Sequence, residues 1–169
     1  LIISGLADRQ TPRYDLADRI ARQLVERQKP WSAADEAVLA QMARVYTTKQ
    51  ASIIGCETVP RSDTDKYGIV ATSGSGDTLR IESIVEKPKP AVAPSNLAVV
   101  GRYLLSPRIF EHLARLGRGA GGEIQLTDGI ARLLDEEAVY AYRFRGERYD
   151  CGNKLGYLEA TVAYALAHP

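Results

Sequence analysis

The stretch KYGIVATSGSGDTLRIESIVEKPKP, residues 66–90, decides the fold that we predict for this chain. Its two halves, within 66–73 and 78–87, are rich in the β-branched and aliphatic residues typical of strands. Between them, Gly74 and Gly76 supply the permissive backbone that a hairpin turn needs. Elsewhere strands and helices alternate along the chain, and a hairpin within such a chain implies a mixed sheet. We therefore predict an α/β fold with a mixed, mostly parallel sheet flanked by helices.

Hydrophobic periodicity and capping residues predict the elements around this hairpin. Ser106 with Pro107 is typical of a helix start, Thr127 is a candidate cap for a short helix, and Asn153 is a candidate cap for the last one. We expect the last helix to pack back on the sheet. In total, we predict helices over 14–28, 32–48, 106–117, 124–134 and 154–168. Besides the two strands of the hairpin, we predict strands over 51–60, 95–106 and 138–146.

Composition is that of a single globular domain, which we place over 1–169. The chain has 169 residues, of which 45% are hydrophobic and 25% charged. Its net charge of +1 gives no field that would recruit nucleic acid or a membrane surface. No leader is visible and no apolar run approaches the roughly 18 residues that span a bilayer, so we expect a cytoplasmic protein. The spacing of Cys56 and Cys151 indicates buried, reduced thiols.

The pair Glu86-Lys87 is the first of four polar features that the fold alone does not require. It ends a predicted strand, and ligands of open α/β sheets bind at the carboxyl ends of strands. The carboxylate would accept from sugar hydroxyls and the ammonium would meet a phosphate. Because side chains alternate along a strand, the two can act together only where the strand bends into the proline loop. The alternative is a solvated strand end.

A glycine in a strand and a glycine-rich loop are the second and third features. Gly68 lies inside a predicted strand, which marks either a close approach by a ligand or tight packing against a large neighbour. The loop GAGGEIQLTD, residues 119–128, lacks the spacing of a dinucleotide or P-loop motif. It is a flexible connection by itself, with Glu123 and Asp128 as capping or orienting groups.

Asp150, in RYDCGNKLGY at 148–157, is the fourth feature. A carboxylate at a strand-to-helix turn suits magnesium, which prefers hard oxygen ligands and borrows waters and phosphates for the rest. The alternative is a capping contact at the start of the helix.

Taken together, these stretches resemble bacterial UTP–glucose-1-phosphate uridylyltransferases over about Ala37–Pro169. The match is carried by KYGIV, IVEKPKP, PSNLAVVGRYLLSPRIFEHL, GGEIQLTDGIARLL and RYDCGNKLGYLEATVAYAL, in that order. The resemblance implies a Rossmann-like nucleotidyltransferase fold, UTP and glucose 1-phosphate as substrates, Mg2+ as cofactor and a homo-oligomer. Carried over by position, it implies substrate-binding roles for Gly68, Glu86, Lys87 and Val99, a metal-ligand role for Asp150, and catalytic roles for Lys87 and Asp150.

The first 36 residues depart from this family. Its members open with a glycine-rich loop for the triphosphate, a step that reads the uracil and a second acidic metal ligand, and 1–36 shows none of them. We expect LIISG to be an early strand separated from Ala37 by a missing segment, with 37–169 as the sugar-phosphate side and the last helix. Three functions stay open: a uridylyltransferase, a sugar-phosphate-binding or oligomerising homologue without catalysis, and a structural domain.

Overall fold

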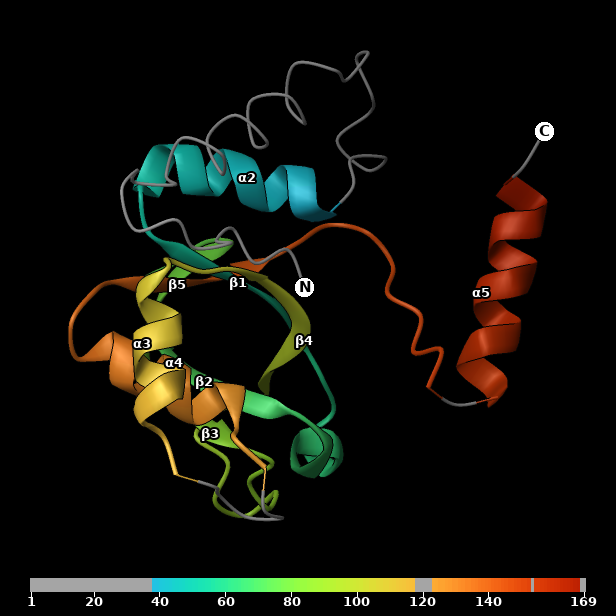
Figure 1. Cartoon of the computed structure of the whole chain (residues 1–169). Helices are drawn as coiled ribbons and strands as arrows, with labels where there is room; N and C mark the ends of the chain where they lie inside the picture. Colours follow the sequence, from blue (N-terminus) through green and yellow to red (C-terminus); the bar gives the residue numbers. More distant parts are fainter. Residues whose placement is uncertain (1–37, 118–122, 153, 168–169) are drawn as a thin grey trace.

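Five strands form a mixed sheet that closes into a barrel in the computed structural model, which describes residues 38–117, 123–152 and 154–167 (Figure 1). Around the barrel the strands follow the order β1-β4-β2-β3-β5, and β5 pairs with β1 to close it. The strands are β1 (Ser52–Thr58), β2 (Gly68–Ser73), β3 (Thr78–Glu86), β4 (Leu97–Leu104) and β5 (Val139–Arg143).

Among the residues that the structure describes, four α-helices and one 3-10 helix connect and flank these strands. The 3-10 helix η1 links β1 to β2, while α3 and α4 lie together between β4 and β5 along the chain (Figure 1). Their bounds are α2 (Val38–Lys49), η1 (Arg61–Lys66), α3 (Arg108–Arg115), α4 (Leu126–Leu134) and α5 (Lys154–Ala167).

The predicted mixed sheet is confirmed, but its mostly parallel character is wrong for the described strands. Only β1 and β5 run parallel, whereas β1/β4, β2/β3, β2/β4 and β3/β5 are antiparallel. Parallel neighbours need a long crossover, and the β1–β5 pair has one because α3 and α4 lie between these strands in sequence. The short turn 74–77 confirms the predicted hairpin, with positive φ at Gly74 and Gly76.

The hydrophobic core fills the space between the barrel and the helices α3 and α4. Ile54, Val70, Ile130, Leu133 and Val139 are fully buried within it. Cys56 joins the same cluster, and burial raises the pKa of its thiol from 9.0 to about 12, against the opposing effect of Arg143. The prediction of a buried thiol is therefore confirmed for Cys56 and wrong for Cys151, which lies exposed in the turn before α5.

Both serine and threonine caps were predicted wrongly. The residue before α3 is Pro107. The Ser106 carbonyl accepts from the Ile109 amide at 3.2 Å, and the Ser106 amide donates to Ser52 Oγ at 3.0 Å, but its hydroxyl caps nothing. Helix α4 begins after Gln125, so Thr127 lies inside its first turn. The hydroxyls of Ser106 and Thr127 are buried and have no hydrogen-bond partner among the described residues. Packing against the barrel has taken precedence over capping at both positions.

Helix α5 has the predicted extent, but it does not pack back on the sheet. It stands to one side of the barrel in Figure 1, and Leu155, Leu158 and Leu166 are 65%, 59% and 82% exposed. Amphipathic spacing identified the helix without identifying its neighbour. The helix predicted over 14–28 and the cap at Asn153 lie outside the described residues. In the part of the chain that the structure describes, no helix is long and apolar enough to cross a membrane.

Candidate active site

One end of the barrel gathers the ends of four strands and four of the predicted site residues. Gly68 at the start of β2 pairs with Glu86 at the end of β3. Ile69 pairs with Ala98, so Gly68 and Val99 occupy adjoining positions on β2 and β4. Lys87 follows Glu86 directly. Residues that are up to 31 positions apart in sequence, from Gly68 to Val99, are thus neighbours in the fold.

The backbone bends where β3 ends, as the charged pair requires. Lys87 has φ of 45°, in the left-handed region that residues other than glycine seldom adopt, and its amide donates to the Tyr67 carbonyl at 3.0 Å. Instead of pointing apart, the side chains meet, with Lys87 Nζ 3.9 Å from Glu86 Oε1. Such an exposed pair stabilises a fold little. Conformational strain at a charged, accessible pair is characteristic of binding sites.

Gly68 is surrounded closely by protein. A Cβ at this position would lie 3.0 Å from Thr127 Cγ2 and 3.4 Å from Glu86 Oε2. The sequence left two interpretations of Gly68 open, and the structure supports tight packing, with Thr127 as the neighbour. The absence of a side chain at Gly68 also leaves room for the Glu86 carboxylate beside the strand.

The 3-10 helix η1 holds the loop that follows Lys87. Arg61 donates through Nε to the Pro90 carbonyl at 3.1 Å and through Nη2 to the Ala93 carbonyl at 2.7 Å. The buried Thr64 hydroxyl lies 3.1 Å from the Arg61 carbonyl and 3.2 Å from the Pro88 carbonyl. The proline-rich loop is therefore held to η1 by side-chain bonds, which fixes the turn at Lys87.

Tyr103 on β4, which sequence reasoning did not select, is affected by the charge of Glu86. Burial, and after it the negative charge of Glu86, raises the pKa of the Tyr103 hydroxyl to about 12. The phenol therefore stays protonated at neutral pH and keeps a proton to donate near Glu86. Alternation along GRYLL gave no signal for this role, because it places Tyr103 among ordinary half-buried strand residues.

Asp150 lies on the segment 144–152 that connects β5 to α5. Its Oδ1 accepts from the Gly152 amide at 3.0 Å, a turn contact that lies before the first residue of α5. Two residues earlier, Arg148 Nε donates to Glu57 Oε2 at 2.6 Å, which holds this segment to the carboxyl end of β1. In the residues described, no group of three or more His, Cys, Asp or Glu side chains is arranged to hold a metal ion. Asp150 by itself provides one carboxylate as a hard oxygen ligand.

Comparison with known proteins identifies the fold and its family. The family model described as nucleotidyl transferase matches residues 33–166, which is most of the chain. The chain belongs to the nucleotidyl transferase family. This assignment agrees with the Rossmann-like nucleotidyltransferase fold that the sequence resemblance implied, and it covers the barrel, α3, α4 and the segment that carries Asp150.

Within the nucleotidyl transferase family, several proteins similar to this chain carry the name uridylyltransferase. A protein named UTP–glucose-1-phosphate uridylyltransferase from Staphylococcus epidermidis is 47% identical over 137 residues, covering 80% of this chain and 48% of that protein. A second protein of that name, from Staphylococcus saprophyticus, is 47% identical over 134 residues, covering 79% and 46%. The chain spans about half the length of the curated relatives that it matches.

Solved structures give the same result. A UDP-glucose pyrophosphorylase complexed with UDP-glucose has a TM-score of 0.74 and 41% identity, covering 79% of this chain and 51% of that one. The UTP-bound enzyme from Acinetobacter baumannii has a TM-score of 0.70 and 44% identity, covering 83% and 48%. The resemblance to uridylyltransferases that IVEKPKP and RYDCGNKLGY indicated is therefore confirmed.

Proposed function

We propose that this chain acts in uridylyl transfer from UTP to glucose 1-phosphate, giving UDP-glucose and pyrophosphate. The observation that carries the proposal is the left-handed turn at Lys87, which brings an ammonium and the Glu86 carboxylate to the same end of the barrel as Gly68. A carboxylate beside a cation matches a ligand that presents hydroxyls next to a phosphate. Relatives at 47% identity that carry the name of this activity support it.

In this proposal, each residue has a simple binding task. Glu86 accepts hydrogen bonds from glucose hydroxyls, Lys87 neutralises phosphate charge, and the backbones of Gly68 and Val99 line the sugar. The side chains of Lys87 and Glu86 are 61% and 31% exposed, so both are accessible to a ligand. Lys87 can contact the phosphate directly because its ion pair with Glu86 is long and solvated.

The residues present fit a magnesium ion in a limited way. Asp150 supplies one carboxylate, and magnesium is commonly held by one or two carboxylates with waters and substrate phosphates completing its coordination. Bound there, the ion would contribute charge neutralisation at the phosphates. Because a sugar phosphate is already ionised at neutral pH, the protein needs no nucleophile or general base. Its residues act by orientation and charge.

A second function, binding of glucose 1-phosphate without turnover, is favoured by one fact. The predicted substrate-binding residues, Gly68, Glu86, Lys87 and Val99, address the sugar and the phosphate rather than the nucleotide. A homo-oligomeric state and a cytoplasmic location belong to the first proposal, and sedimentation and cell fractionation would test them.

Calorimetric titration with each substrate, beside a pyrophosphate-release assay in magnesium, separates these functions. Lys87→Ala should weaken glucose 1-phosphate binding by about 2 kcal/mol, the scale of a charged hydrogen bond. Lys89→Ala is the matched control, since Lys89 is exposed in the same loop. Turnover that is lost in Asp150→Ala supports transfer, whereas glucose 1-phosphate binding without response to UTP supports the second function. A protein that binds neither substrate contradicts both.

A further inference from the structure

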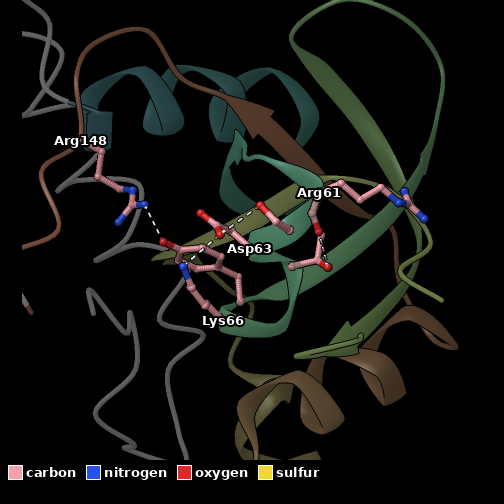
Figure 2. A network of polar contacts seen from close by, with 7 residues as sticks. Arg61, Asp63, Lys66 and Arg148 are labelled. Atoms are coloured by element: carbon pink, nitrogen blue, oxygen red, sulfur yellow. Dashed lines mark hydrogen bonds and ion pairs between the residues drawn. The ribbon is translucent and has the colours of Figure 1, made fainter. Parts of the chain in front are cut away.

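Arg148 is more constrained than an ordinary surface arginine. Its Nε donates to Glu57 Oε2 at 2.6 Å. Its Nη2 donates to the Tyr67 hydroxyl at 3.3 Å, the contact marked at Arg148 in Figure 2. The guanidinium also lies 5.5 Å from the centre of the Tyr67 ring. The side chain is only 17% exposed. Burial of the guanidinium lowers the pKa of Arg148, but its bonds to Glu57 and Tyr67 outweigh this effect and leave the pKa raised. Its planar fork is therefore used by two partners at once.

Tyr67 connects this arginine to the candidate active site. While its side chain contacts Arg148, its carbonyl accepts from the Lys87 amide at 3.0 Å. The next residue, Gly68, begins β2 and pairs with Glu86. A single residue thus contacts the segment that carries Asp150 through its side chain and the turn at Lys87 through its backbone.

The charges around Arg148 indicate positioning rather than direct ligand binding. Its positive charge is balanced by Glu57 at close range, and two of its donor nitrogens are already bonded within the protein. A guanidinium in this state is poorly suited to attract a further anion. Its contacts instead join the ends of β1 and β2 to residues 144–152, which have no helix or strand of their own.

We propose that Arg148, Glu57 and Tyr67 form a clasp that positions the segment carrying Asp150 relative to the turn at Lys87. The clasp keeps the position of Asp150, the proposed metal ligand, fixed relative to Lys87, the proposed phosphate-binding cation. The catalytic meaning of the clasp rests on the proposed function, because the transfer depends on correct relative placement of the two groups. The positioning effect of the clasp is a structural property, so it can be tested without an activity assay.

Hydrogen exchange of the full chain, compared between the wild type and Arg148→Ala, tests the clasp. We expect the hydrogen-bonded amides of Lys87 and Gly152 to exchange at least about tenfold faster in the variant, because the local opening free energy falls where the contacts are lost. Amides of the central strands, such as Val70 and Ala98, should keep their wild-type rates. Arg108→Ala is the control. Arg108 is the first residue of α3, and it forms an exposed ion pair with Glu136.

Three outcomes would overturn the clasp. The first is an unchanged Lys87 amide, which would show that Tyr67 does not transmit the loss. The second is a uniform rise across the barrel, which would make Arg148 a general support of stability. The third is full restoration by Arg148→Lys, because one ammonium cannot reproduce the fork shared by Glu57 and Tyr67. Failure of the turnover assay with the expected exchange pattern would reject the proposed function and leave the clasp intact.

Discussion

At the scale of single residues, the site depends on the lack of a side chain at Gly68 and on the left-handed backbone conformation of Lys87. Gly68 has no side chain, and Thr127 and Glu86 occupy the space that a Cβ would fill. The left-handed φ of Lys87 redirects its side chain toward that of Glu86. The turn at Lys87 adds little to stability and is better explained by binding, whereas the lack of a side chain at Gly68 is explained by its close packing against Thr127.

The first prediction concerns the space at Gly68. Gly68→Ala should lower the free energy of unfolding by about 1–3 kcal/mol, because its Cβ would overpack against the Thr127 methyl group. Adding Thr127→Ser removes that methyl group and should recover most of the loss. Urea unfolding of both variants measures the effect. Gly117→Ala is the control, because a Cβ there meets nothing within 4 Å. Wild-type stability in Gly68→Ala would show that Thr127 moves aside freely.

At the scale of elements, η1 and the proline-rich loop act as one unit. Arg61 and Thr64 bond the carbonyls of Pro88, Pro90 and Ala93, and Tyr67 bonds Lys87. The exposed face of η1 carries a further pair, in which Lys66 Nζ lies 3.0 Å from Asp63 Oδ1 (Figure 2). Sequence analysis predicted the loop from its prolines and left η1 without a role, because the partners of Arg61 and Thr64 lie more than 20 positions away.

The second prediction tests this unit. Thr64→Val keeps the volume of the side chain but removes the hydroxyl that lies between the carbonyls of Arg61 and Pro88. We expect a loss of about 1–3 kcal/mol in the free energy of unfolding, the cost of leaving a buried acceptor unpaired. Chemical denaturation measures it. Glucose 1-phosphate affinity should fall as well, because the turn at Lys87 is adjacent. Thr58→Val, at an exposed end of β1, should be neutral, and an equal loss there would reject the interpretation.

At the scale of the whole molecule, the barrel is joined to α2 and to the segment after β5 by long-range polar contacts. The buried Gln41 donates to the Arg145 carbonyl at 2.8 Å and accepts from the Arg145 amide at 2.9 Å. This amide pair connects residues 104 positions apart. It places the beginning of the segment that leads to Arg148 and Asp150, before Glu57 and Tyr67 hold it further along.

The third prediction removes this connection. Gln41→Leu leaves both backbone groups of Arg145 without their partner, so the free energy of unfolding should fall by about 1–3 kcal/mol. Gln50→Leu is the matched control, because the Gln50 side chain is exposed and bonds only the nearby Thr47 carbonyl among the contacts resolved here. Thermal unfolding of the two variants should differ clearly, and identical midpoints would show that the Arg145 contacts add little to stability.

The sequence by itself determined the elements and the family, because both are encoded locally. Glycines at the turn predicted the hairpin, apolar periodicity predicted α4 and α5, and the motifs around Glu86 and Asp150 identified the nucleotidyl transferase family. Capping failed as a guide at Ser106 and Thr127, where side chains are buried against the barrel instead.

Only the tertiary structure decided the strand directions, the exposure of α5, and the contacts that surround the site. Strand pairing and burial depend on which distant segments meet, and a one-dimensional pattern does not contain that information. The same reason applies to Arg148, which lies within a motif quoted from the sequence and yet had no assigned role. Its partners, Glu57 and Tyr67, are 91 and 81 positions away, and only the folded chain brings them together.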